Sequence, residues 1–142
     1  MNKIFVRLLL IFAFGVAGCS TPSATSMVSS DYQPKKYGVV AIYDSIEANF
    51  LELELQMFFE ELGYRTIGEN ELVKYRGRAL GVRCSTDYFV ASELYKITIL
   101  LEDAETDKTV CTVRGEAEGR RDKARSAAWD KASEELRRLI GE

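Results

Sequence analysis

Hydrophobic and polar positions repeat with two different periods after residue 36, and each change of period marks an element. Residues 37–43, YGVVAIY, form an apolar, partly β-branched run that is too short for a helix. This pattern is typical of a strand buried on both faces. The first strand of the domain is therefore expected here.

The next segment, from Asp44 to Gly63, has the period of a helix. Asp44 and Glu47 have the spacing of a capping box, and Gly63 stands where a helix ends. The stretch from Phe50 to Met57 also alternates like a strand, but the start signal, the stop signal and the length favour a helix. The apolar positions at helical spacing are Leu51, Leu55, Phe58 and Leu62.

Two shorter elements are expected after that helix. Tyr64 to Ile67 is a short strand, and a strand–helix–strand unit with brief connections predicts parallel pairing with a right-handed crossover. Residues 69–80 have a weaker helical pattern, which Gly77 interrupts and Gly81 ends.

The stretch over 85–102 alternates between apolar and polar positions, which predicts one strand with a preferred face. Glu93 interrupts the apolar parity. Aromatic residues on such a strand are expected to pack against a helix rather than to line a ligand site. The apolar positions are Phe89, Ala91, Tyr95, Ile97, Ile99 and Leu101.

A polar turn, AETDK, follows, and the chain is predicted to return as an antiparallel strand over 109–118. Closing this turn places Leu101 opposite Cys111 and Ile99 opposite Val113. A slip by one residue would turn one apolar set outward, so this register is favoured.

Residues 121–140 carry one stripe of small and apolar residues, which predicts a packing helix. The stripe consists of Ala124, Ala128, Ala132, Leu136 and Ile140. The full order is strand, helix, strand, helix, strand, strand, helix. It predicts one small α/β (α+β) domain over 37–142, with a mixed sheet and helices packed on it.

A separate apolar run at 8–17 has about ten residues, fewer than the roughly 20 that span a bilayer. Lys3 and Arg7 precede it, and a lipobox ends it. Residues 1–18 are therefore predicted to be a lipoprotein signal peptide, and Cys19 to carry the lipid that anchors the protein. A plain secretory signal with an accidental cysteine is the alternative. The lipobox residues are Val16, Ala17, Gly18 and Cys19.

Ser20 follows the cysteine instead of Asp, which favours the outer membrane and a position facing the periplasm. Residues 19–36 are rich in Ser and Thr and contain both prolines of the chain. This composition predicts a flexible tether.

Charge argues against nucleic acid as a partner. Removal of residues 1–18 takes away Lys3 and Arg7 but no acid, so the formal net charge changes from −3 to −5. The remaining basic residues are dispersed among acids, apart from the pairs at 120–121 and 137–138. No cationic face is evident.

Lipidation of Cys19 leaves Cys84 and Cys111 as an even pair in an oxidising compartment. A disulfide between them would contribute roughly 3 to 4 kcal/mol. However, Cys111 faces Leu101, and one continuous strand would hold Cys84 far beyond the roughly 6 Å Cα separation of a disulfide. The disulfide therefore requires the chain to fold back near Glu93; otherwise both residues are buried free thiols.

Signatures of catalysis and ligand binding are few. No histidine occurs, which removes Ser-His and Cys-His pairs and His-liganded zinc. Neither glycine-rich phosphate-binding pattern occurs, and the acidic turn at 102–107 lacks the spacing of a calcium loop. We expect no catalytic residue, no cofactor and no metal site. The acids expected on solvent faces of helices are Glu52, Glu54, Glu60, Glu61, Glu134 and Glu135.

Four short stretches carry a resemblance: VVAI at 39–42, LGY at 62–64, DYFV at 87–90 and LEDAETDK at 101–108. With the last helix, they resemble the small α/β domains of bacterial envelope lipoproteins and assembly factors. In particular, they resemble the amino-terminal domain of the Tol-system periplasmic protein and the curli secretion channel lipoprotein. The resemblance implies a fold only, because the chain lacks the propeller of one and the membrane-spanning hairpins of the other.

Three functions follow from these patterns. The leading hypothesis is a non-enzymatic, membrane-anchored lipoprotein that faces the periplasm and docks to another envelope protein. A small-ligand-binding domain would need a deep apolar pocket near the strand aromatics. A carboxylate-dependent enzyme on envelope polymers would need two acids that converge in a cleft.

Overall fold

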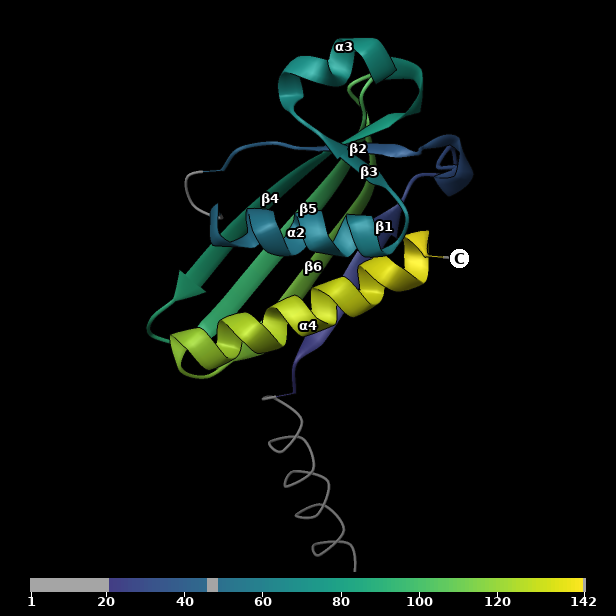
Figure 1. Cartoon of the computed structure of the whole chain (residues 1–142). Helices are drawn as coiled ribbons and strands as arrows, with labels where there is room; N and C mark the ends of the chain where they lie inside the picture. The colour runs from purple at the N-terminus through teal and green to yellow at the C-terminus, as the bar shows by residue number, and fades with distance from the viewer. Residues whose placement is uncertain (1–20, 46–48, 142) are drawn as a thin grey trace, which may run out of the picture.

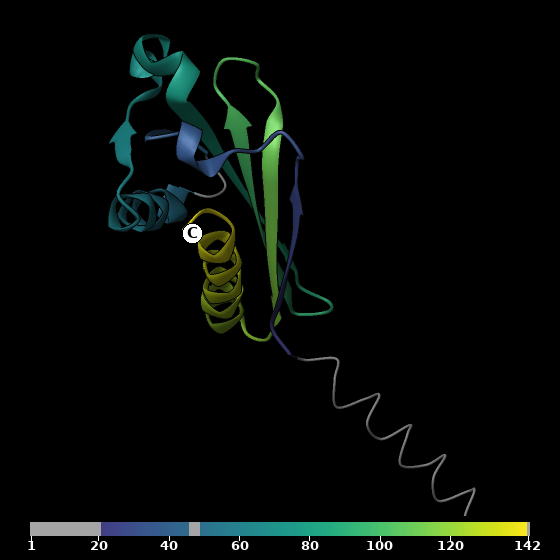
Figure 2. The same ribbon diagram turned by 90° about the vertical axis from the view of Figure 1, so that its right-hand side faces the viewer.

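The protein is described by a computed structural model over residues 21–45 and 49–141. They form a six-stranded mixed sheet in the order β1-β6-β5-β4-β2-β3, with helices α2 and α4 on one face (Figure 1, Figure 2). The α/β class is confirmed. The elements are β1 (Ser23–Val28), β2 (Val39–Ile42), α2 (Asn49–Glu61), β3 (Arg65–Ile67), α3 (Leu72–Tyr75), β4 (Ala79–Phe89), β5 (Leu94–Asp103), β6 (Thr109–Glu118) and α4 (Arg121–Ile140), with 3₁₀ turns at Pro34–Lys36, Glu69–Glu71 and Arg76–Arg78.

The predicted strand–helix–strand unit forms. β2 pairs in parallel with β3 on one side and with β4 on the other. After α2, Gly63 has a φ of +92°, the left-handed conformation that favours glycine. The Tyr64 N–H then donates to the Phe59 carbonyl at 3.0 Å, which ends the helix.

Two predicted helix boundaries differ from the structure or lie outside it. The expected capping box includes Glu47, which is not among the described residues. The helix expected over 69–80 is limited to α3 and its flanking 3₁₀ turns, and β4 already begins at Ala79. The helix ends early because of a tertiary contact: residues 79–82 pair with β2, and their backbone groups are no longer available to a helix.

The single strand predicted over 85–102 is wrong. The chain folds back at 90–93, and β4 and β5 pair antiparallel up to Phe89 opposite Leu94. Glu93, which interrupts the alternation, has a φ of +51° and belongs to the turn. Folding back satisfies the backbone hydrogen bonds of both strands. It also directs the Phe89 side chain away from the core, so that 49% of this residue is exposed to solvent.

The predicted register of the β5–β6 pair is confirmed: Leu101 lies opposite Cys111, and Ile99 opposite Val113. All four side chains belong to the core between the sheet and the helices. The other face of these strands is polar and carries ion pairs such as Lys96 to Glu116 at 3.7 Å.

The predicted stripe of α4 is confirmed as the buried face of that helix. Close approach to β6 depends on Gly115. A Cβ at this position would lie 2.9 Å from the Ala132 Cβ and closer still to the Ala128 carbonyl oxygen. None of the helices within the described ranges is long and apolar enough to cross a membrane.

Residues 23–28 are part of the sheet, which corrects the expectation of a flexible tether for this part of 19–36. β1 pairs antiparallel with β6 along its whole length, beginning with Ser23 opposite Glu116. The Ser26 hydroxyl also donates to the Glu135 carboxylate of α4 at 2.6 Å. The edge of β6 supplies backbone hydrogen-bond partners for a segment that has few apolar side chains to bury. The composition of this segment therefore could not reveal the strand.

Candidate functional site

The predicted lipidation site lies outside the described residues, together with the rest of the lipobox. Cys19 and residues Val16, Ala17 and Gly18 therefore stay a prediction from the sequence.

Cys84 and Cys111 are buried free thiols. The chain does fold back as the disulfide requires, but β5 lies between the strands that carry the two cysteines. Two strand spacings separate them by about 10 Å, more than the roughly 7 Å limit between bonded Cα atoms. Burial raises the pKa of Cys84 to about 12 and that of Cys111 to about 11, so both thiols are protonated and unreactive near neutral pH.

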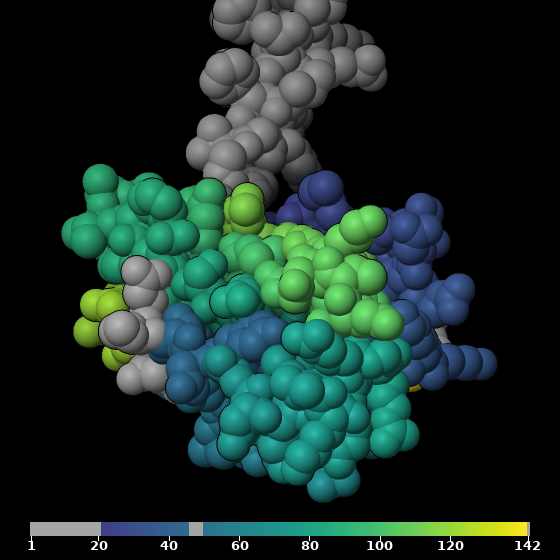
Figure 3. Space-filling view, turned by 90° about the horizontal axis from the view of Figure 1, so that it is seen from above, coloured from purple at the N-terminus to yellow at the C-terminus, as the bar shows by residue number. Residues whose placement is uncertain are grey.

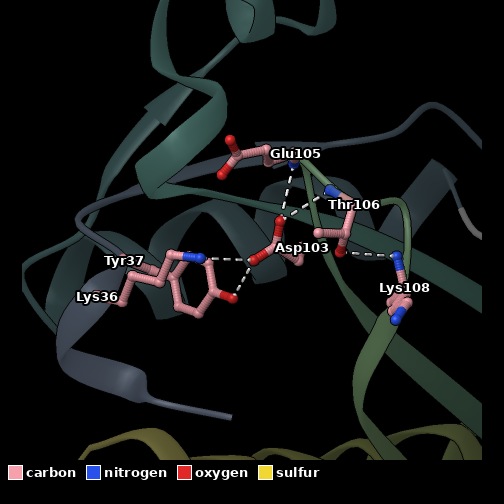
Figure 4. Close-up of polar contacts among 6 residues, drawn as sticks. All are labelled: Lys36, Tyr37, Asp103, Glu105, Thr106 and Lys108. Carbon is pink, nitrogen blue, oxygen red and sulfur yellow. Dashed lines mark hydrogen bonds and ion pairs between the residues drawn. The ribbon is translucent and has the colours of Figure 1, made fainter. Parts of the chain in front are cut away.

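Asp103, at the end of β5, is the buried charged residue of the described part of the chain, with 5% of its surface exposed. Its Oδ2 accepts hydrogen bonds from the Lys36 ammonium at 3.1 Å and the Tyr37 hydroxyl at 2.6 Å (Figure 4). Its Oδ1 accepts from the backbone N–H groups of Glu105 at 2.8 Å and Thr106 at 3.1 Å. We call this arrangement the Asp103 clamp.

The Asp103 clamp cannot serve as a general acid or base near neutral pH. Burial by itself raises the pKa of Asp103, but the hydrogen bonds from Tyr37, Lys36 and the two backbone N–H groups outweigh it and hold the pKa at about 2. Each oxygen is already engaged by two donors. The clamp therefore joins the segment before β2 to the β5–β6 turn.

The same turn also contacts the start of β4. The Ala104 N–H donates to the Ala79 carbonyl at 3.1 Å. Seen from this end of the molecule, the turn and the segment over 69–78 lie side by side (Figure 3). Within the described ranges, no group of three acidic or sulfur ligands is arranged to hold a metal ion.

Two acids line an open groove of about 350 Å³ beside α2. Glu52 and Glu71 border it with Gln56 and Thr66, and a Glu52 oxygen accepts a hydrogen bond from the Ser45 N–H at 3.2 Å. The groove is lined mainly by polar groups, unlike the deep apolar pocket that a small-ligand site needs.

Among the strand aromatics, Tyr95 is buried in the core. Tyr88 packs against Tyr95, with the two ring centres 5.8 Å apart.

Helix α2 is apolar on two faces. One face, with Leu51, Leu55 and Phe59, is buried against the sheet. The other presents Phe50, Leu53 and Met57 to solvent, with exposed fractions of 39%, 64% and 60%. These three residues, at i, i+3 and i+7, form what we call the α2 stripe.

Polar side chains, most of them acids, border the α2 stripe. At 100° per residue, Glu54 and Glu61 lie along one side of it, and Gln56 and Glu60 along the other. The strand-like alternation over 50–57 was the sequence signal for this surface, since alternating apolar residues on a helix cannot all face the core. In the sequence alone, that alternation indicates only a competition between strand and helix.

No protein-family model matches the chain, and no curated protein matches it either. Solved structures share its fold. PelC from Paraburkholderia phytofirmans, a dodecamer in two crystal forms, is 13% and 14% identical, with TM-scores of 0.57 and 0.56. The matches cover 86% and 84% of this chain and 100% and 98% of PelC. Lipoprotein GNA1162 from Neisseria meningitidis is 10% identical over 72% of this chain and 96% of its own, with a TM-score of 0.43.

Proposed function

We propose that this chain is a lipid-anchored, periplasm-facing envelope protein without enzymatic activity, whose copies assemble with one another through the α2 stripe. The observation that carries the proposal is the second apolar face of α2, with Leu53 and Met57 well exposed. Neighbouring exposed apolar residues at helical spacing are typical of a docking face.

The fold supports a second copy of the chain as the partner, because PelC, with the same fold, is a dodecamer. The acids beside the stripe, such as Glu54 and Glu60, would meet their own counterparts if two stripes packed face to face. We therefore expect the stripe of one copy to contact a different surface of the next. A head-to-tail contact of this kind closes into a ring when its rotation allows.

Several observations support the non-enzymatic part of the proposal. The buried acid Asp103 is ionised and already accepts hydrogen bonds from four donors, and the thiols of Cys84 and Cys111 are protonated. The anchor and the periplasmic location rest on the lipobox at Cys19 and on the order of residues before it.

Site-specific photo-crosslinking in the native host tests the assembly. A photoreactive residue at Leu53 of the full-length lipoprotein should give a product of twice the chain's mass that contains only this chain. The control position is Ser85, which is exposed and lies on the sheet face opposite α2. Crosslinking to a different protein alone would contradict self-assembly, and no product at Leu53 or Met57 would contradict the role of the stripe.

A pair of variants separates assembly from folding. Leu53→Glu together with Met57→Glu should abolish the crosslinked product while leaving the unfolding transition unchanged, since both side chains are exposed. Val73→Glu, at an apolar residue that is 72% exposed outside the stripe, is the matched control and should keep the product.

A further inference from the structure

The path from the predicted anchor to the sheet is short. β1 starts at Ser23, so only three residues lie between it and Cys19. Four residue steps span at most about 14 Å even in an extended chain. If Cys19 carries lipid, the end of the sheet that holds Ser23 must therefore lie close to the membrane surface.

Two turns lie at this same end of the sheet (Figure 1, Figure 2). The β4–β5 turn over 90–93 and the β6–α4 turn are joined, because the Gly119 N–H donates to the Glu93 carbonyl at 2.9 Å. The Tyr88 hydroxyl donates to the Gly119 carbonyl at 3.3 Å. Pro22 and Leu94 line one cleft, which places the incoming chain beside the start of β5.

The β4–β5 turn, together with Phe89 at the end of β4, forms a tip with exposed apolar side chains. Phe89 is 49% exposed and Val90 is 77% exposed, and Ala91 follows on the surface. Basic side chains lie beside this tip: the Lys96 ammonium is 5.4 Å from the centre of the Phe89 ring, and the Arg121 guanidinium is 5.9 Å from that of Tyr88. An apolar tip with long basic side chains beside it is typical of a surface that sits at the headgroup level of a bilayer.

Net charge does not explain this surface, because acids accompany the basic residues. The exposed charged residues near the two turns are Asp87, Glu93, Glu118, Asp122, Arg120, Arg121 and Lys123. Attraction to anionic lipid is therefore weak, and insertion of the apolar tip is the favourable contact.

We infer that the β4–β5 turn is a second membrane contact, in which Phe89 and Val90 enter the headgroup region beside the lipid on Cys19. This inference rests on the proposed anchor. Lipid and turn together would hold the domain in one orientation, with α3 at the end away from the membrane (Figure 1).

A fluorescent label tests the contact in the full-length, lipidated protein, reconstituted into vesicles of phosphatidylethanolamine with a minority of phosphatidylglycerol. Val90→Cys gives an exposed thiol for an environment-sensitive dye, whereas Cys84 and Cys111 are buried and react slowly. Val73→Cys is the matched control, because Val73 is similarly exposed, at 72%, but lies on α3. Dye at position 90 should shift to the blue and be quenched by nitroxide lipid, and dye at position 73 should do neither.

The possible results separate this inference from the proposals beneath it. If the protein does not float with the vesicles, the anchor is wrong and the membrane contact falls with it. If the protein floats but the dye at position 90 reports water, the anchor stands and the contact is wrong. A blue shift without quenching by nitroxide lipid would mean that another protein surface covers the turn, which also overturns the contact.

Discussion

The Tyr37 hydroxyl donates a 2.6 Å hydrogen bond to the Asp103 carboxylate, and this bond joins two segments that are 66 positions apart. Tyr37 precedes β2, the strand near one edge of the sheet, whereas Asp103 ends the central strand β5. The bond thus helps to hold the N-terminal segment against the middle of the sheet.

Removal of this hydroxyl should destabilise the protein. Tyr37→Phe is expected to lower the free energy of unfolding by about 1 to 3 kcal/mol, because a buried carboxylate loses a charge-assisted hydrogen bond. Urea denaturation followed by circular dichroism measures the change. Arg83→Ala is the control, since it breaks an ion pair to Glu102 whose arginine is largely exposed, and it should cost less than about 1 kcal/mol. Equal losses in the two variants would contradict the clamp.

Stability should fall as the pH drops from about 4 toward 2. The folded pKa of Asp103, about 2, lies below the ordinary value of 3.8, so the unfolded chain binds the proton more tightly. The stabilisation is complete above the ordinary value and is lost as the pH falls through the folded one. Urea midpoints measured across this range should decline less steeply for Asp103→Asn.

Glu135 contributes to the same decline, because hydrogen bonds from Arg138 and Ser26 hold its pKa at about 2. A residual slope is therefore expected in Asp103→Asn. A slope identical to that of the parent protein would show that Asp103 is not the responsible group.

Gly115→Ala should destabilise the packing of α4 on β6 by about 3 kcal/mol, because the new Cβ would collide with the backbone of Ala128 and with Ala132. Thermal unfolding measures the effect. Gly38→Ala is the matched control, since an added Cβ there has no atom within 4 Å. If the two variants melt together, the close approach of helix and strand is wrong.

The two cysteines of the domain should titrate as free thiols. After denaturation, Cys84 and Cys111 should both react with a thiol reagent without prior reduction, and in the native protein both should react slowly because they are buried and protonated. Cys84→Ala should leave one reactive thiol in the denatured domain. A domain that needs a reductant before any thiol reacts would contain the disulfide after all.

Local pattern was enough for much of the fold. The stripe on α4 and the pairing of Leu101 with Cys111 are decided by which face of one element is apolar. The end of α2 at Gly63 is decided by a single glycine that adopts a positive φ. Such periodicity is a property of neighbouring residues, so it can be read without knowing the partner.

The surface of α2 could be predicted only in part from the local pattern. Its alternating residues were visible in the sequence, but a helix with two apolar faces does not say which one packs. Contact with the sheet buries the face of Leu55 and leaves Leu53 and Met57 in solvent.

By itself, the sequence determined the strand–helix–strand unit, the last helix and the register of the β5–β6 hairpin, and it predicted the anchor at Cys19. Only the tertiary structure decided that residues 23–28 join the sheet, that the chain turns back before Leu94, that Asp103 is buried, and that Cys84 and Cys111 stay apart. The physical reason is common to all four. Backbone hydrogen bonds and buried charges are satisfied by partners distant in the chain, and a local pattern of apolar residues does not identify those partners.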